Sequence, residues 1–316
     1  MADAHDREVD TRSPRLGRSH EASGNGSGPP PAPLIVTAAD AVALGPARLL
    51  SARRGARVVL LMGEPGSGKT ALIAGLWQQL LEQDGLAGHR LAGSRTALGL
   101  ERRAHWHRVA ARRHASGAPA TAIAEAVLLH LRMCRPDGRR VELLISDMSG
   151  EQFERVREGR PLVDEIPWAS HGDRFAILVD GATLGRQGES EIAITQAQRL
   201  LFSLQSSRAV RESARVALVV TKADLLDIAG EQAVRRHEAP LLEAAREADP
   251  EAVLIRTAAM PAAVEDVRGL GELLGWLCSD DRRRPGEPAP EEHAVEHATG
   301  QAVEQATVPA IEEFRW

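Results

Sequence analysis

The residues best suited to chemistry in this sequence lie in a glycine-rich stretch, GEPGSGKT at residues 63–70. It matches the pattern G-x-x-x-x-G-K-[ST] and stands between a short apolar run and a helical pattern. Glycines there let backbone N–H groups surround an anion, Lys69 adds a cation for the β and γ phosphates, and the Thr70 hydroxyl suits Mg²⁺. The predicted phosphate cradle consists of Gly63, Pro65, Gly66, Ser67, Gly68, Lys69 and Thr70.

A second motif, Asp147-Met148-Ser149-Gly150, fits D-x-x-G and ends a predicted strand. A carboxylate at Asp147 can hold Mg²⁺ through a water molecule, and the Gly150 N–H can contact a γ-phosphate. The alternative is a purely structural turn that ends the strand and binds no ligand. The position of the motif, after a strand and downstream of the phosphate loop, favours the metal interpretation.

A third motif, Thr221-Lys222-Ala223-Asp224, directly follows the apolar run VALVV and fits [NT]-K-x-D. Asp224 can accept two hydrogen bonds from guanine, and adenine lacks both donors. The stem of Lys222 can lie across the base while its head stays near the phosphate loop. The alternative is an aspartate at a helix N-terminus with a flanking lysine. Further on, residues 256–259 offer a looser match, in which the Ala258 backbone N–H contacts the guanine O6.

The elements that must position these motifs alternate between strand and helix. The expected strands span residues 57–62, 126–135, 141–146, 175–179, 216–220 and 253–255, and the expected helices span 70–83, 192–204, 231–248 and 269–278. A Pro136-Asp137-Gly138 turn makes strands 126–135 and 141–146 a β-hairpin. We expect Pro240 to break its helix in two. The fold class is α/β, a three-layer α-β-α P-loop NTPase with a mostly parallel sheet and one antiparallel edge strand from the hairpin.

The helix at 70–83 shows apolar residues at helical spacing, namely Ile73, Leu76, Trp77, Leu80 and Leu81. Residues 33–280 are expected to form the folded domain, with an insertion at about 85–120. The Pro-, Gly- and Ser-rich residues 1–32 are expected to be a disordered tail. The acidic residues 281–316 are expected to be a frayed tail, with a docking peptide for a partner as the alternative.

Composition excludes several classes of protein. The formal net charge is −5, concentrated in the C-terminal tail, so a nearly neutral body argues against nucleic acid as a partner. Two cysteines without CxxC spacing argue against a disulfide framework or a structural zinc and favour the cytoplasm. No apolar run reaches the roughly 18–20 residues that cross a bilayer, so we expect no integral membrane segment.

Taken in order, GEPGSGKT, DMSG, TKAD and the weak TAA resemble four motifs of Ras-like GTPases of the translation-factor-related class, over about residues 56–279. AGSRTALG before the hairpin and SDMSGEQF after it are also similar to a bacterial branch, the double-GTPase family. The resemblance implies GTP or GDP with Mg²⁺ as cofactors and slow hydrolysis in a regulatory switch. It also implies a protein effector or regulator that reads the switch regions.

Two departures from that class bear on mechanism. Relatives carry Gln directly after the D-x-x-G glycine, whereas this chain has Glu151 there and Gln152 next. We expect one of these two residues to serve hydrolysis. The first switch is also long, and its Mg²⁺-binding threonine is either Thr96 or Thr121, with Thr96 favoured.

The basic segment at residues 101–114, ERRAHWHRVAARRH, lies in the same switch region. It predicts either a solvated helix face with Trp106 and Val109 turned into the core, or a functional surface. As a functional surface it would bind an effector or carry an arginine that reaches the γ-phosphate. Two other functions remain open for the whole chain: a GTP-binding scaffold without turnover, and a P-loop ATPase or kinase.

Overall fold

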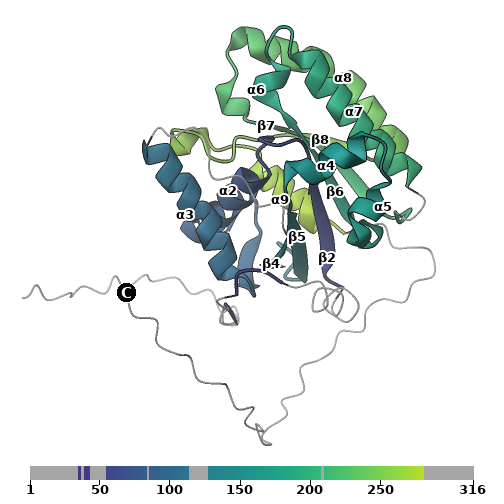
Figure 1. Cartoon of the computed structure of the whole chain (residues 1–316). Helices are drawn as coiled ribbons and strands as arrows, with labels where there is room; N and C mark the ends of the chain where they lie inside the picture. Colours follow the sequence, from purple (N-terminus) through teal and green to yellow (C-terminus); the bar gives the residue numbers. More distant parts are fainter. Residues whose placement is uncertain are drawn as a thin grey trace, which may run out of the picture. The chain divides into compact units, whose positions relative to one another are not determined.

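The computed structural model describes residues 35–36, 39–42, 55–83, 85–113, 127–207 and 210–280, and the predicted tails lie outside this part of the chain. Its centre is an eight-stranded sheet with the order β1-β3-β4-β5-β2-β6-β7-β8 (Figure 1). The strands are β1 (Ile35–Val36), β2 (Arg57–Met62), β3 (Arg90–Ser94), β4 (Val127–Cys134), β5 (Arg140–Asp147), β6 (Arg174–Asp180), β7 (Arg215–Thr221) and β8 (Val253–Arg256).

The sheet is covered on both sides. The α-helices are α2 (Lys69–Glu82), α3 (Ala97–Arg113), α4 (Gly150–Arg157), α5 (Leu162–Glu165), α6 (Gly181–Leu184), α7 (Ser190–Ser206), α8 (Ile228–Ala248) and α9 (Leu270–Cys278). Short 3-10 turns include Ala223–Leu225, after β7. The three-layer α/β fold predicted from the sequence is confirmed.

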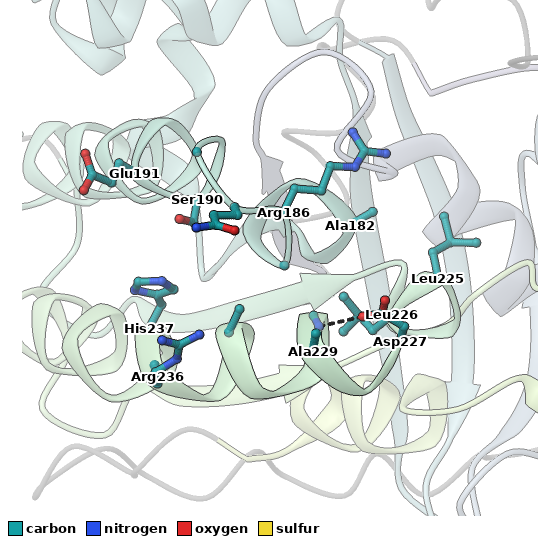
Figure 2. Close-up of a pocket in the computed structure, with 15 residues that line it drawn as sticks. Ala182, Arg186, Ser190, Glu191, Leu225, Leu226, Asp227, Ala229, Arg236 and His237 are labelled. Carbon is teal, nitrogen blue, oxygen red and sulfur yellow. Dashed lines mark hydrogen bonds between the residues drawn. The ribbon is translucent and has the colours of Figure 1, made fainter.

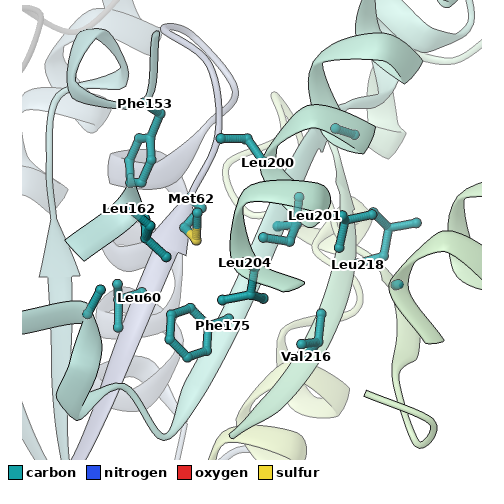
Figure 3. Packing of buried hydrophobic residues seen from close by; sticks show 14 of the residues in the cluster. Leu60, Met62, Phe153, Leu162, Phe175, Leu200, Leu201, Leu204, Val216 and Leu218 are labelled. Atoms are coloured by element: carbon teal, nitrogen blue, oxygen red, sulfur yellow. The ribbon is translucent and has the colours of Figure 1, made fainter. Parts of the chain in front are cut away.

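Alternate residues of the buried strand β2 serve the two sides of the sheet, as the period of a strand requires. Leu60 and Met62 join one apolar cluster with α4, α5, α7 and α8, in which Phe153, Phe175 and Leu204 also pack (Figure 3). Val59 and Leu61 join a second cluster with α2, α3 and α9. Because both faces of β2 are covered, its sequence is a continuous apolar run.

The hairpin β4–β5 supplies the antiparallel strand, as predicted, and Gly138 in its turn has a φ of +82°. However, β4 does not lie at the edge. β3 pairs antiparallel with β4 on its other side, and β1 pairs parallel with β3. The expected insertion at 85–120 therefore contributes strand β3 and helix α3 to the domain itself, and residues 114–120 lie outside the described part.

Two helical expectations were wrong in detail. Trp106 on α3 is exposed, at 53% of its surface, and α3 instead buries Leu100 and Ala104. Pro240 does not divide its helix, because α8 runs unbroken from Ile228 to Ala248. Pro240 lies on the exposed face, where water can satisfy the carbonyl that loses its N–H partner.

Both cysteines, Cys134 and Cys278, are free thiols. None of the helices in the described ranges combines the length and the apolarity needed to traverse a bilayer.

Replacing Pro240 by Ala should raise the free energy of unfolding by about 1–3 kcal/mol, because alanine restores the missing helix hydrogen bond on the exposed face of α8. Urea denaturation followed by circular dichroism measures this. Gln232→Ala, exposed in the same helix, serves as the control and should change stability by less than about 0.5 kcal/mol. A Pro240→Ala protein no more stable than the parent would show that α8 does not continue through this position.

Candidate functional site

The predicted motifs meet at one edge of the sheet. β5, β2, β6 and β7 are adjacent and parallel, so their carboxyl ends lie side by side. Asp147 ends β5, the loop 63–70 follows β2, Asp180 ends β6 and Thr221 ends β7. In open parallel sheets this edge is where ligands bind.

The loop at 63–70 has the backbone that an anion cradle requires. Gly66 and Gly68 have φ values of +77° and +92°, a left-handed conformation that favours glycine. Helix α2 begins at Lys69, directly after the loop. A helix leaves its first N–H groups without intrahelical acceptors, so the loop and the start of α2 together offer donors and partial positive charge to a phosphate.

Two polar side chains inside this loop have the surroundings of an anion site. Lys69 is buried, and its Nζ donates to the carbonyl oxygens of Gly63 (2.8 Å) and Glu64 (2.9 Å). Desolvation lowers the pKa of Lys69 to about 8, although Asp147 and Glu64 act to raise it. The Ser67 Oγ is buried and finds no hydrogen-bond partner among the described residues. An anion in the loop would offset the desolvation of the Lys69 ammonium and give the Ser67 hydroxyl an acceptor.

Thr70 and Asp147 bring two hard oxygen atoms together. The Thr70 Oγ1 donates to the Asp147 Oδ1 over 3.1 Å, and Asp147 is 1% exposed. Among the described residues, no group of three or more His, Cys, Asp and Glu side chains forms a metal cage. Mg²⁺ typically takes one or two protein oxygens and completes its shell with water and phosphate, so this pair fits that ion.

Helix α3 reaches the same carboxylate. The Arg103 Nε lies 2.5 Å from the Asp147 Oδ2, and an Arg103 amino group donates to the Gly99 carbonyl over 2.8 Å. One turn further, His107 has a buried Nε2 without a partner in the described part of the chain. Burial lowers the pKa of His107, and the Asp147 charge opposes that shift. The face of α3 that carries Arg103 and His107 is therefore turned toward the phosphate edge.

Gly150 lies directly against the phosphate loop. A Cβ atom at this position would lie 2.2 Å from the Pro65 nitrogen, so only glycine fits. The Arg157 guanidinium at the end of α4 pairs with the Glu64 carboxylate at 2.6 Å. Burial raises the pKa of Glu64, and Arg157 opposes this. Both ends of α4 are thus tied to the loop.

Thr221 joins the third motif to the first. Its Oγ1 donates to the Ser67 carbonyl over 2.8 Å and also lies 3.2 Å from the Val179 carbonyl. Next to it, the Lys222 Nζ pairs with the Asp180 Oδ2 at 2.6 Å. The segment 221–224 and the loop 63–70 are therefore parts of one site.

Asp224 lies half-buried in the short turn after Lys222, and its carboxylate has no hydrogen-bond or ion-pair partner among the described residues. Ala258 is different. It is fully buried, and its N–H donates to the Arg268 carbonyl over 3.1 Å. That donor is already used within the chain, so the predicted contact of Ala258 with a base would require this bond to break.

The remaining predicted residues lie around this edge. Glu151 is exposed in the first turn of α4, and the Gln152 Oε1 is buried without a partner among the described residues. Thr96 is fully buried at the start of α3, where its Oγ1 accepts a hydrogen bond from the His130 N–H over 2.8 Å. Its metal role stays a prediction, and Thr121 lies outside the described residues.

Sequence reasoning missed Asp180 and did not single out Arg103. Asp180 ends a buried strand and is followed by Gly181, where a Cβ would lie 2.4 Å from the Thr221 carbonyl. An Asp-Gly pair at the carboxyl end of a parallel strand was the available signal. Arg103 is one of five arginines in the basic segment, and nothing in their spacing distinguishes it.

A cavity of about 1140 Å³ lies elsewhere, between α6, the start of α7 and α8 (Figure 2). Arg236 and His237 on α8 lie across it from Glu191 on α7. No residue of the phosphate loop lines it, so its size does not mark the site assembled here.

The comparison with protein families agrees with this assembly. The model of the family described as Double-GTPase 2 matches residues 57–277, well over half of the chain. The chain belongs to the Double-GTPase 2 family. The P-loop GTPase resemblance of the sequence is thereby confirmed, and the family supports a GTP-binding protein. No curated protein matches the chain.

Two solved structures share parts of the fold with this Double-GTPase 2 chain. Elongation factor SelB of Methanococcus maripaludis, in complex with the GTP analogue GppNHp, is 13% identical with a TM-score of 0.40, covering 72% of this chain and 35% of that one. A bacterial selenocysteine-specific factor, EF-Sec, is 13% identical with a TM-score of 0.37, covering 70% and 28%. The chain thus spans about a third of the length of these factors, and likeness at this level carries no functional argument.

Replacing Thr221 by Val should lower the free energy of unfolding by about 1–3 kcal/mol, because the buried Ser67 carbonyl loses its donor. The same change should weaken guanine nucleotide binding, since it loosens the junction between the two motifs. Thermal unfolding and titration with a fluorescent GTP analogue measure the two effects. Thr221→Ser keeps the hydroxyl and should stay near the parent in both. Equal behaviour of the two variants would contradict a structural role for this hydroxyl.

Proposed function

We propose that this chain binds GTP together with Mg²⁺, hydrolyses the GTP slowly and acts as a regulatory switch. The observation that carries the proposal is the hydrogen bond from the Thr221 hydroxyl to the Ser67 carbonyl. It joins a phosphate cradle to a motif suited to guanine, so that both belong to one site. Membership of a GTPase family supports guanine over adenine and so disfavours the ATPase alternative.

The base end of the proposed site rests on Asp224. Its half-buried carboxylate lacks a partner among the described residues, as expected of an acceptor that hydrogen-bonds to a ligand. The Arg268 guanidinium donates to the neighbouring Ala223 carbonyl, which holds the turn in place. Lys222, kept at the end of β7 by Asp180, can lie along the base.

Thr70 and Asp147 would hold the magnesium ion. When bound, the ion would neutralise charge on the β and γ phosphates. Lys69 would add a second positive charge, and the N–H groups of the loop and of α2 would orient the phosphates. The Gly150 backbone, packed on the loop, would move with the presence or absence of a γ-phosphate.

The switch itself would involve α3 and α4, since both contact the phosphate edge and also reach the surface. Arg103 and Arg157 link these helices to Asp147 and Glu64. Trp106 on α3 is exposed, and a large exposed aromatic is a common anchor for a protein partner. A protein effector or regulator would read the position of these helices.

A GTP-binding scaffold without turnover is the second candidate. It is favoured by Glu151, an exposed acid at the position where Ras relatives carry glutamine. A carboxylate there repels the γ-phosphate more than an amide does, and the neighbouring Gln152 has its Oε1 buried.

Replacing Asp224 by Asn should weaken GTP binding by about tenfold or more and shift preference toward xanthosine triphosphate, because the amide reverses the donor pattern. Competition between the two nucleotides against a fluorescent analogue measures the shift. Asp227→Asn, three residues on, is the matched control, because asparagine still caps α8 by accepting from the Gly230 N–H. If Asp224→Asn binds GTP as well as the parent does, Asp224 does not contact the base.

Replacing Glu151 or Gln152 by Ala should slow single-turnover GTP hydrolysis by about tenfold or more in at least one variant, since positioning of the attacking water would be lost. Glu158→Ala, at the exposed end of α4, is the control and should hydrolyse at the parental rate. Unchanged rates in both variants would remove both residues from the mechanism.

A further inference from the structure

Arg103 occupies an unusual place for a cation. Its guanidinium contacts the Asp147 Oδ2, while the other oxygen of that carboxylate, Oδ1, accepts from Thr70. Asp147 is almost fully buried, and the Arg103 side chain is 18% exposed. The pair therefore lies inside the site, next to Thr70, and not on the outer surface of α3.

The other arginines of α3 with described side chains are turned away. Arg102 pairs with Asp40 on the surface, where both side chains are 57% exposed. Arg108 pairs with Glu101 on the same helix. Glu101 also accepts from the indole of Trp77 on α2, so α3 is packed beside α2 at this point (Figure 1). Of the α3 arginines whose side chains are described, Arg103 is the one that faces the phosphate edge.

The charges of Arg103 and Asp147 neutralise each other only while this ion pair is intact. A buried charge that loses its counter-ion is costly, by several kcal/mol in typical cases. Binding of Mg²⁺ beside Asp147 would draw this carboxylate to the ion and leave the guanidinium without its anion. The nearest new anion would be the triphosphate in the adjacent loop, and a planar guanidinium is well matched to phosphate oxygens.

We propose that Arg103 moves from Asp147 to the γ-phosphoryl group of bound GTP and there stabilises the charge that develops during hydrolysis. In this reaction water adds to the γ-phosphorus, and one of its protons passes to an oxygen of the released phosphate. The bond from that phosphorus to the β–γ bridging oxygen breaks, and its electron pair leaves with GDP. Arg103 keeps all its protons throughout. The inference rests on the proposed function, and it names a catalytic residue outside the four sequence motifs.

His107 adds an independent observation. It lies four residues after Arg103, on the same face of α3, and its buried Nε2 has no partner in the described part of the chain. An unpartnered polar atom is expected where a ligand will supply the partner. The buried face of α3 therefore carries polar side chains at two successive turns, where a helix with only a packing role would carry apolar ones.

The test compares Arg103→Ala and Arg103→Lys with Arg102→Ala as the matched control. Arg103→Ala should slow single-turnover GTP hydrolysis by about a hundredfold or more, the typical loss for a charge-stabilising group. Arg103→Lys should recover part of the rate, and Arg102→Ala should match the parent. Fluorescent GDP and GTP titrations are run on every variant.

A second readout separates catalysis from positioning. GDP with aluminium fluoride mimics the transferring phosphoryl group, and the parent should retain this complex with Mg²⁺ whereas Arg103→Ala should not. If Arg103 only positions Asp147, Arg103→Ala will weaken GDP, GTP and the fluoride complex by the same factor, which overturns the inference. A hydrolysis rate within about twofold of the parent overturns it as well. Either result leaves the proposed function standing, whereas a parent protein that binds no GTP removes the proposed function itself.

Discussion

The site depends on one hydrogen bond, from the Thr221 hydroxyl to the Ser67 carbonyl. β6 and β7 pair in register so that Asp180 lies opposite Thr221, and Gly181 allows the two strand ends to approach closely. The phosphate loop is therefore attached to the end of β7, two strands away from the strand that it follows. This attachment fixes the separation between the Lys69 ammonium and the Asp224 carboxylate, the two groups at opposite ends of the proposed nucleotide.

Charge in the site is balanced within the chain. Arg103, Lys222 and Arg157 each pair with a carboxylate at the phosphate edge, namely Asp147, Asp180 and Glu64. Lys69 has two carbonyl acceptors instead, and burial lowers its pKa to about 8. A triphosphate would bring several negative charges and Mg²⁺ two positive ones, so binding must exchange these partners. Because Arg103 belongs to α3 and Arg157 to α4, that exchange would reach both helices without a separate relay.

The sequence predicts best where one physical requirement decides the residue type. The continuous apolar runs of β2, β6 and β7 follow from burial on both faces, and Gly66 and Gly68 follow from positive φ angles. Prediction fails where the surroundings decide. Pro240 is tolerated because its face of α8 is exposed to water, and α3 buries Leu100 and Ala104 rather than Trp106. None of these outcomes is encoded in local spacing.

The start of α3 limits how Arg103 can move. The Ser94 hydroxyl donates to the His130 carbonyl, the Thr96 hydroxyl accepts from the His130 N–H, and the Arg95 N–H donates to the His130 Nδ1. Because Nδ1 is the acceptor, Nε2 carries the proton, and it lies 3.4 Å from the Glu142 carboxylate. The hydrogen bond from His130 and the ion pair with Arg132 together lower the pKa of Glu142 to about 2. Residues 94–96 are thus clamped to β4. Arg103 lies two turns beyond this clamp, so it can exchange partners by a change of rotamer or a small tilt of α3 while the sheet stays intact.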